Sequence, residues 1–430
     1  MKYVVRFVME EIASALKKAG IARGKDNVLS VQIYGKKKKE IEADGVKAIK
    51  FWTAIVAVGP TLQATCGVYA EVKCVSDDSS TQEDVPDKNV VFHVPGTFRD
   101  CVEALSVGND SVICVFDEKE VRLSGGNGAN TVKLPAAQKP TFFSKLNGER
   151  VVVSVPAKDF LNGVKICATA LYSPSKEGFG ASIGVVPTAG TDGAMLSMLS
   201  TDMVNVAGMD FKCSGITGDD AEAYREKAKN LPYFMLDSGK LSAICSSGNA
   251  QKVTLFFLYK EDEGVKVPQR VDIYLGDSVF QMVCGAKCYT AAMKNVMNFT
   301  SAGCVFTCLR KTLETACNLE AVGKTMSANP PILLNVSEKG VMVEGEQSRS
   351  RMYGCEVEKA AAAEGGTTEI YVGIPVLLNA LKVSGEKAKI SISDRGLILV
   401  QPEDARAKFC TTQKTREKAE APEAEPDMEE

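Results

Sequence analysis

The sequence predicts an α+β fold of three domains, each built from two repeated units of antiparallel strands plus a helix. Three observations predict it: a strand–turn–helix pattern recurs six times, alternating strand pairs follow most of the helices, and the chain has 430 residues. At roughly 100–200 residues per domain, that length accommodates two to four domains. Internal repetition restricts architecture more firmly than local propensity does, so the repeat carries most of the prediction.

The repeated pattern is an apolar strand, a short turn and a helix rich in Leu, Ala and Cys. Successive copies begin roughly 60–90 residues apart, as expected for one supersecondary unit with loops of variable length. Strand and helix occupy residues 3–7 and 9–19, 90–95 and 97–105, 151–156 and 157–171, 232–236 and 238–246, 304–308 and 309–322, and 369–373 and 374–383. The pattern predicts six helices, each preceded by a strand.

Proline placement supports the boundary between strand and helix. Pro95, Pro156 and Pro375 lie near these junctions, where a missing backbone amide costs little. Apolar residues then recur at three- and four-residue spacing, which predicts one buried face per helix. In the first helix these residues are Met9, Ile12, Ala13, Leu16 and Ala19, and in the fifth they are Leu309, Leu313, Ala316, Cys317 and Glu320.

Alternating strands joined by short polar turns follow the helices. Such pairs occupy residues 111–116 and 121–124, 332–336 and 341–344, and 389–393 and 397–400. One helix and a few strands cannot bury the helix alone, so two units should pair, with their helices on one face of the sheet. Six units give three domains, which we place at residues 1–147, 148–299 and 300–413. Residues 414–430, rich in Glu, Pro, Ala and Lys, predict an acidic disordered tail.

Composition indicates an ordinary folded protein. Apolar residues make up 45% of the chain and charged residues 24%, close to the averages of globular proteins. The longest apolar stretch, near residues 51–58, is too short to cross a bilayer, and residues 1–6 lack the layout of a signal peptide. We therefore expect no membrane partner and a cytoplasmic location.

The cysteines are numerous but scattered. There are 14 of them with no CxxC pair, and the only histidine is His93. In a chain without an export signal, reduced thiols that pack as small hydrophobic residues are expected. Cys101, Cys167, Cys245 and Cys317 fit this role, because each falls within an apolar helical pattern. We expect neither a metal site nor a cofactor.

Charge is unevenly distributed along the chain. The whole chain carries −3, but residues 414–430 hold three basic and seven acidic side chains, so the rest carries +1. Binding to phosphates needs clustered Lys and Arg rather than a positive total. An acidic exterior with a basic inner surface would fit this balance.

Three features could indicate other chemistry. The run Gly125–Gly128 lies between two strand patterns and lacks the lysine of a P-loop, so a hairpin turn is favoured over a phosphate cradle. The run Lys36–Lys39 could bind nucleic acid, but a solvated charge run in a loop is favoured. A cysteine hydrolase needs a partner base, and His93 alternates within a strand pattern. We expect no catalytic residues and no enzyme.

The order and spacing of several motifs resemble the bacterial DNA polymerase III β subunit, the β sliding clamp. Residues 90–135 resemble the second half of a first clamp domain, and residues 368–402 resemble the closing stretch of that family. Residues 61–66, Thr-Leu-Gln-Ala-Thr-Cys, are similar to the family's TLTATD, and residues 199–202 are Leu-Ser-Thr-Asp. The resemblance covers most of the chain and rests on the combined order of these motifs.

Two departures from the family are clear. Its TDGHRLA motif corresponds to residues 201–207, which keep Thr201, Asp202 and Ala207 but replace Gly-His-Arg by Met-Val-Asn. Its apolar C-terminal strand corresponds to residues 408–413, Lys-Phe-Cys-Thr-Thr-Gln, which are followed by the acidic tail.

The resemblance implies three DNA-clamp domains whose helices line the inside of a ring, closed by a homodimer around double-stranded DNA. It implies a processivity factor of DNA replication that tethers the replicative DNA polymerase and other DNA enzymes, and that also has the clamp loader as a partner. A clamp-like scaffold or adaptor that does not encircle DNA is the alternative, because function must be argued from sites rather than folds.

DNA contact in such a ring would be independent of sequence, because hydrogen bonds to base edges would hold it at particular sites. The candidate residues are Lys17, Lys18, Arg23, Lys25, Lys158, Lys165, Lys176, Arg310, Lys311 and Lys324. The alternative for each is a solvated side chain with no role in binding.

The position of the family's peptide groove predicts a partner site between the second and third domains. Its residues are Phe179, Thr201, Asp202, Met203, Val204, Val206, Phe409, Cys410, Thr411 and Thr412. A tether shared by several enzymes needs a small apolar pocket, and the Met-Val-Asn replacement predicts a more apolar peptide. The alternative is that these residues form the core of a hairpin.

Ring closure would join free sheet edges of the first and third domains. Strand pattern and resemblance assign residues 111–116 and 332–336 to these edges. A proline at Ile113 would then produce monomers.

Overall fold

The computed structural model describes most of the chain. The described residues are 1–22, 27–43, 46–75, 82–83, 85–126, 128, 130–146, 148–171, 182–190, 193–202, 204–213, 220–285, 302–321, 330–345, 349–360, 367–404 and 406–412. They form antiparallel strands and seven α-helices, which confirms the predicted α+β class. None of these helices is long and apolar enough to cross a membrane.

The chain divides into two compact units. The first comprises Met1–Val164, Gly184–Ser197 and Phe211–Cys288, and the second comprises Lys165–Ile183, Met198–Asp210 and Tyr289–Glu430. The division into domains at residues 147, 299 and 413 stays a prediction.

The first unit is built on a long antiparallel sheet. Its strands follow the order β10 (Glu149–Pro156), β15 (Lys252–Asp262), β16 (Val265–Leu275), β17 (Ser278–Val283), β4 (Leu62–Val75), β1 (Lys2–Val8), β7 (Ser111–Phe116), β8 (Glu120–Gly125) and β9 (Thr131–Pro135). Beside β4 lie β3 (Val46–Val58) and β5 (Gln82–Glu83), and β2 (Val28–Ala43) joins β3 to β6 (Asn89–Pro95). Strand β17 pairs directly with β4, with Ser278 opposite Cys66, so residues far apart in sequence share one sheet.

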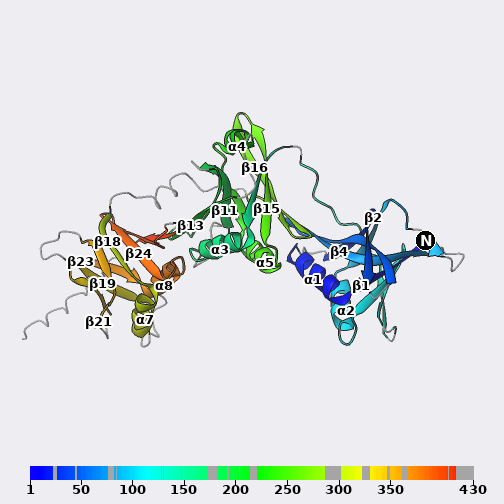
Figure 1. The fold of residues 1–430 in the computed structure, drawn as a ribbon, viewed down its shortest axis with the longest axis horizontal. Helices are drawn as coiled ribbons and strands as arrows, with labels where there is room; N and C mark the ends of the chain where they lie inside the picture. Colours follow the sequence, from blue (N-terminus) through cyan, green and yellow to red (C-terminus); the bar gives the residue numbers. More distant parts are fainter. Residues whose placement is uncertain are drawn as a thin grey trace, which may run out of the picture. The chain divides into compact units, whose positions relative to one another are not determined.

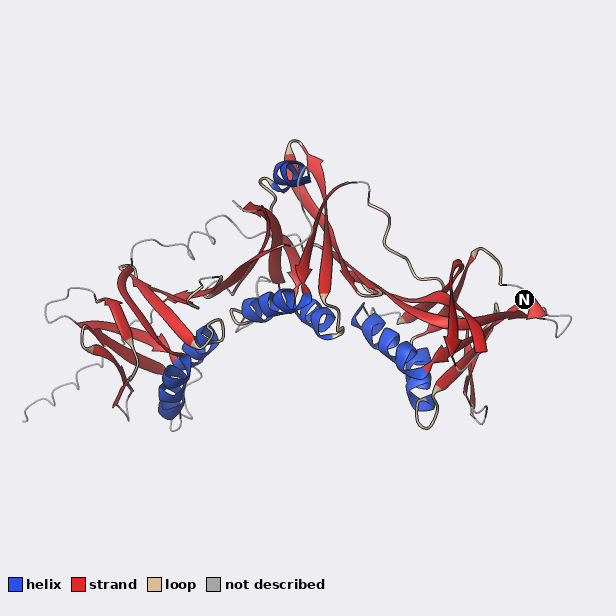
Figure 2. Ribbon diagram, in the orientation of Figure 1, coloured by secondary structure: helices blue, strands red, loops and turns tan. Residues whose placement is uncertain are grey.

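Two helices, α1 (Met9–Ala19) and α2 (Thr97–Leu105), lie against the same face of this sheet (Figure 2). The buried side of α1 consists of Met9, Ile12, Ala15, Leu16 and Ala19. The predicted stripe contained Ala13, which is exposed, because the helix turns its Ala15 side toward β4. Acidic residues in the first turn of α1 and lysines in its last turn complement the helix dipole.

Several further elements lie between α1 and β15 along the chain. They are the 3₁₀ turn η1 (Gly20–Ala22), α3 (Ala157–Ala168), β11 (Ser182–Gly190), β12 (Gly193–Thr201), β13 (Val206–Lys212), α4 (Asp220–Ala228), β14 (Phe234–Asp237) and α5 (Ser238–Ser246). Asp237 fixes the start of α5, since its side chain accepts a hydrogen bond from the Lys240 backbone N–H at 2.8 Å.

Among its described residues, the second unit contains two groups of strands and two helices, besides the end of α3. In one group β13 is followed by β26 (Ala407–Thr412), β25 (Leu397–Gln401), β24 (Lys387–Ser393), β18 (Ala302–Leu309) and β22 (Glu356–Lys359). The other group runs β21 (Arg349–Arg351), β20 (Gly340–Glu344), β19 (Pro331–Ser337) and β23 (Thr367–Gly373). Helices α7 (Arg310–Ala321) and α8 (Ile374–Leu381) contact each other (Figure 1).

All six predicted strand–helix repeats are present. They are β1–α1, β6–α2, β10–α3, β14–α5, β18–α7 and β23–α8. Pro375 lies in the first turn of α8, as the junction argument requires. Gly125–Gly128 contains a turn, with Gly128 N–H donating to the Gly125 carbonyl at 2.8 Å.

Two predictions about strands are wrong. Residues 111–116 (β7) and 331–337 (β19) are interior strands, since β7 pairs with β1 and β8, and β19 pairs with β20 and β23. Alternation shows which face of a strand is buried but not which strands lie beside it, and this explains the error. In addition, Lys36–Lys39 lies in β2 rather than in a loop, although its side chains are exposed as expected.

Candidate functional site

The predicted partner site is assembled around the turn between β12 and β13. Asp202 organises this turn: its Oδ1 accepts from the backbone N–H of Val204 at 3.0 Å and of Asn205 at 2.6 Å. Asp202 Oδ2 accepts from Asn205 Nδ2 at 2.9 Å, and Thr201 Oγ1 donates to the Asn205 carbonyl at 2.7 Å. Asp and Asn favour such turns because their side chains replace missing backbone partners. The turn is therefore locally encoded.

Strand β26 brings the C-terminal part of the predicted site to this hairpin. In the antiparallel register, Val206 is opposite Cys410 and Ala207 is opposite Phe409. Two segments about 200 positions apart in the sequence, which were predicted to form one site, are thus neighbours in the second unit. Phe179 and Met203, also predicted for the site, lie outside the described residues.

Five of the eight described side chains of the site are buried. They are Thr201, Val206, Phe409, Cys410 and Thr411, and this burial fits the hairpin-core alternative for those five. Val204 at the turn is 58% exposed, and Thr412 is also exposed. An apolar contact with a partner at this site would therefore begin at Val204.

A second layer of contacts supports the hairpin from the end of α3. Ser200 Oγ donates to the Cys167 carbonyl at 2.5 Å, and Cys167 Sγ donates to the Ala207 carbonyl at 3.9 Å. Burial raises the pKa of the Cys167 thiol well above its usual range, so this thiol stays protonated at neutral pH. Its role is structural, as the sequence predicts.

Basic side chains on the first-unit helices are solvent-accessible. Lys17 and Lys18 are exposed and half-buried, respectively, at the end of α1, and Lys158 is exposed on α3. A groove of about 450 Å³ between α1 and α2 is lined by Ala13, Leu16, Lys17, Arg99, Val102, Glu103 and Ser106. Arg99 was not predicted from the sequence, because only the packing of α2 against α1 places it beside Lys17.

The second-unit candidates differ from one another. Lys311 and Lys165 are exposed. Arg310, in contrast, is held locally: Nε lies 2.6 Å from Glu314 Oε1, and Nη1 donates to the Ser384 carbonyl at 3.2 Å. Its guanidinium ties the start of α7 to the chain after α8, so it is not readily available for DNA. Arg23, Lys25, Lys176 and Lys324 lie outside the described residues.

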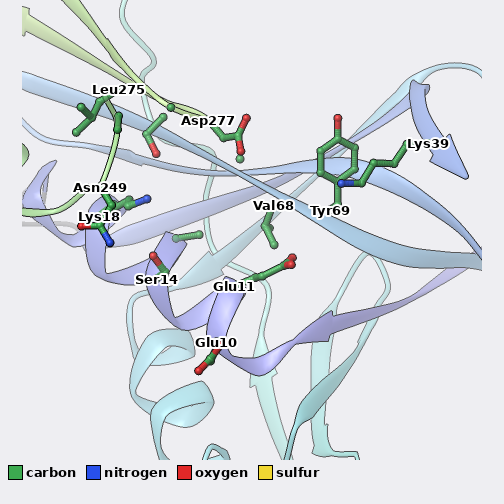
Figure 3. Close-up of a pocket in the computed structure, with 16 residues that line it drawn as sticks. Glu10, Glu11, Ser14, Lys18, Lys39, Val68, Tyr69, Asn249, Leu275 and Asp277 are labelled. Carbon is green, nitrogen blue, oxygen red and sulfur yellow. The ribbon is translucent and has the colours of Figure 1, made fainter. Parts of the chain in front are cut away.

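A polar cavity of about 540 Å³ lies in the first unit beside α1 (Figure 3). Glu10, Glu11, Ser14 and Lys18 of α1 line one side, and residues of β2, β4 and the loops 248–250 and 275–278 line the rest. Lys18 lies beside Asn249 and Lys39 beside Tyr69, whose ring centre is 3.7 Å from Lys39 Nζ (Figure 3).

This cavity has mixed charge and no obvious nucleophile among the described residues. Its two lysines, Lys18 and Lys39, are outnumbered by the carboxylates of Glu10, Glu11 and Asp277. Behind it, burial raises the pKa of the Cys66 thiol to about 12, against a lowering hydrogen bond with Ser278. A thiol with that pKa is a poor nucleophile at neutral pH. Sequence patterns could not reveal the cavity, since its walls come from segments brought together by β17–β4 pairing.

The only histidine of the sequence is also held in the structure. His93 Nδ1 lies 2.9 Å from Ser30 Oγ across the β2–β6 pair, and burial followed by the charge of Lys139 lowers the pKa of its ring. Among the described residues, no group of three His, Cys, Asp or Glu side chains could hold a metal ion.

Comparison with solved structures identifies the fold. The chain matches the β sliding clamp of Caulobacter crescentus with a TM-score of 0.69 and 14% identity, covering 97% of this chain and 100% of the clamp. The DNA polymerase III β chain of Streptococcus pneumoniae matches with a TM-score of 0.70 and 11% identity, and the Bacillus subtilis sliding clamp with 0.70 and 9%, both at the same coverage. No protein-family model and no curated protein sequence matches the chain. The chain has the sliding-clamp fold over nearly its whole length.

Proposed function

We propose that this protein is a DNA sliding clamp: a non-enzymatic processivity factor that encircles duplex DNA and tethers a DNA polymerase to it. The observation that carries the proposal is the full-length match to bacterial β clamps, which covers 97% of this chain and 100% of each of those named above. A fold can host several functions, so the proposal also needs sites that fit the role.

Solvent-accessible lysines on the helices would supply the expected DNA contacts. Lys17 and Lys18 on α1, Lys158 and Lys165 on α3, and Lys311 on α7 have the side chains to neutralise phosphates without reading bases. Such contacts hold the duplex and still permit movement along it. The helices would line the inside of the ring, with three domains contributed by each copy.

Ring closure would use the strands at the ends of the sheets. β9 pairs with β8 alone and β22 with β18 alone among the described strands. β9 carries Lys133 and ends at Pro135, whereas β22 carries Glu356, Glu358, which pairs with Lys389, and Lys359. Charged residues and proline protect a free sheet edge from unwanted pairing, and opposite charges would favour pairing of β9 with β22 of a second copy.

Partner proteins would bind near the hairpin of β12 and β13. We expect the replicative polymerase and the clamp loader to be such partners, acting in the cytoplasm. The exposed Val204 gives an apolar starting point, and the turn lacks the positive charge of the family's Gly-His-Arg sequence. A clamp-like scaffold that does not encircle DNA is the second candidate, favoured by these departures from the family motif.

Loading onto DNA circles separates the two candidates. The full-length protein, with its cognate clamp loader and ATP, is incubated with a nicked circular plasmid and isolated by gel filtration. A topological clamp stays on the circle and is released when a restriction enzyme linearises the plasmid. Equal retention on circular and linear DNA would contradict encirclement. A monomer of 46.0 kDa in solution, rather than twice that mass, would favour the scaffold.

A further inference from the structure

Cys308 and Cys355 face each other across two strands of the second unit. The β18–β22 register places Phe306 opposite Val357 and Thr307 opposite Glu356. Continued by one residue, the same register places Cys308 opposite Cys355, which directly precedes β22. A hydrogen bond joins the two side chains, so the thiols are in contact.

This placement meets the distance requirement of a disulfide. Residues directly opposite in antiparallel strands have Cα atoms about 4.5 or 5.5 Å apart, depending on whether the pair is hydrogen-bonded. Disulfides join residues with Cα atoms about 4.4–6.8 Å apart. The turn before Cys355 is also anchored, since Met352 N–H donates to the Val341 carbonyl at 3.0 Å and Gly354 has a φ of +72°. A bond between the sulfurs therefore needs side-chain rotation but little movement of the backbone.

The two thiols differ in accessibility and in acidity. Cys308 is buried and Cys355 is half-buried. The hydrogen bond, followed by burial, raises the pKa of Cys308, and the same hydrogen bond lowers the pKa of Cys355 against the effect of burial. Cys355 is therefore both the more accessible and the more acidic of the two thiols. Accessible thiolates are the sites at which oxidants react.

We propose that Cys308 and Cys355 form an oxidation site, where a peroxide converts the thiol pair into a disulfide that fastens β22 to β18. The Cys355 thiolate attacks one peroxide oxygen, so that an S–O bond forms as the O–O bond breaks. Cys355 becomes a sulfenic acid, and the released hydroxide takes a proton and leaves as water. Cys308 then attacks the sulfur of the sulfenic acid, the S–S bond forms, and the S–O bond breaks to release a second water. Hydrogen peroxide gains the two electrons that the two thiols give up.

Three of the four other half-buried cysteines among the described residues differ from Cys355 in acidity. Cys101, Cys213 and Cys245 have comparable exposure, but burial raises the pKa of each thiol. Peroxide should therefore select Cys355 over these three. Because β22 is the last strand of its group among the described strands, the disulfide would hold this edge in register. The inference concerns the second unit alone and does not depend on the proposed function.

Peptide mapping tests the site directly. Reduced full-length protein is treated with one equivalent of hydrogen peroxide, the remaining thiols are blocked with iodoacetamide, and the protein is digested without reductant. We expect a linked pair of peptides containing Cys308 and Cys355, a mass decrease of two hydrogen atoms, and full reversal by dithiothreitol. Amide hydrogen exchange in β22 should slow on oxidation and return to its original rate on reduction.

Two variants complete the test. Cys355→Ser should abolish the linked peptides, whereas Cys101→Ser, a matched change at a half-buried cysteine, should leave their yield unchanged. The proposal is wrong if the first product is a lasting sulfenic or sulfinic acid at Cys355, if no 308–355 link forms, or if another disulfide forms in equal yield. Should Cys355→Ser fail to fold, the map of the unmodified sequence still decides between these outcomes.

Discussion

Arg270 and Asp272 form a buried, two-pronged ion pair on β16. Arg270 Nε donates to Asp272 Oδ1 at 2.6 Å, and Nη2 donates to Oδ2 at 3.2 Å. The third nitrogen, Nη1, donates to the Ser144 carbonyl at 3.0 Å, and Gln281 Nε2 donates to Asp272 Oδ2 at 3.4 Å. The pair therefore connects the segment at residues 141–146 to β16 and β17 of the first unit.

Removing one partner of this pair should be strongly destabilising. Asp272→Ala leaves a buried guanidinium without its counter-charge, which we expect to lower the free energy of unfolding by about 3–5 kcal/mol. Asp262→Ala is the matched control, because the Lys260–Asp262 pair on β15 is exposed and such pairs contribute about 0–1 kcal/mol. Urea denaturation measures both. Similar destabilisation in the two variants would refute the structural role of the buried pair.

Glu320 should be a source of instability in the second unit. Its side chain is 3% exposed, and neither carboxylate oxygen has a hydrogen-bond partner among the described residues. Glu320→Leu is expected to raise the free energy of unfolding by about 1–3 kcal/mol, because no polar group is then desolvated without a partner. Lower stability of the leucine variant in thermal and urea denaturation would show that the carboxylate contributes an unrecognised interaction.

A double-mutant cycle can test how closely Glu320 packs. The carboxylate occupies the position that a Cβ at residue 345 would take, so Gly345→Ala should destabilise the protein by about 1–3 kcal/mol. In a Glu320→Ala background the same glycine change should cost much less, because the neighbour is gone. Additive effects would contradict the close packing.

The spacing of apolar residues in the sequence correctly located helices whose buried face depends mainly on local sequence. Three- and four-residue spacing located α1 and α7, and it even placed Glu320 on the buried stripe of α7, where the structure finds it. The spacing was less precise in α1. Ala13 and Ala15 lie on either side of the same apolar face, and only the packing of α1 on β4 makes Ala15 the buried one. Helical spacing fixes a face to within about one position, and tertiary packing decides its centre.

The same sequence patterns could not predict contacts between residues that are far apart in the sequence. Nothing in the alternation of residues 111–116 shows that β7 lies between β1 and β8 rather than at an edge. Arg310 was predicted to contact DNA, but in the structure it pairs with Glu314, and it also donates a hydrogen bond to the Ser384 carbonyl, which follows α8. The family motif grouped two segments that the structure pairs as β13 and β26, but it could not show which of their side chains are buried.

DNA binding should depend on the helix lysines through electrostatics alone. We expect the combined change Lys17→Glu, Lys18→Glu and Lys311→Glu to weaken binding equally for all sequences. The logarithm of the DNA-binding constant falls linearly with the logarithm of the salt concentration. Each phosphate that the protein no longer neutralises should make this negative slope shallower by about 0.9. Arg310 is left unchanged because Glu314 and the Ser384 carbonyl already engage it. The assay is loading on nicked circles across a salt series.

A control with the same change of charge is available on the strands. Lys36, Lys38 and Lys73 are exposed on β2 and β4, and their replacement by Glu should leave the salt slope unchanged. An equal reduction in both triple variants would mean that total charge, and not the helix surface, governs binding.

The effect of a proline substitution in β9 on dimer formation should alternate from one residue to the next. Successive backbone N–H groups of a strand point to opposite sides, so proline at alternate positions from 131 to 134 removes either a bond to β8 or an outward-facing donor. We expect outward positions to give folded monomers in sedimentation analysis, and inward positions to lower stability. Ile113→Pro should unfold the first unit instead, because β7 has partners on both sides. Folded dimers from all four β9 variants would exclude this edge.

Partner binding should depend on Val204, the exposed apolar residue of the turn. Val206 and Phe409 are buried, so changing them would disturb the fold and could not report on binding. Val204→Asp adds a charge to a side chain that is 58% exposed, and it should reduce polymerase stimulation at least tenfold, the effect of removing about 1.4 kcal/mol of binding free energy. Val265→Asp is the matched control, since Val265 is 63% exposed at the start of β16. Both variants should keep the mass and the melting temperature of the parent protein. Full stimulation by Val204→Asp, or an equal reduction in both variants, would move the partner site away from the turn between β12 and β13.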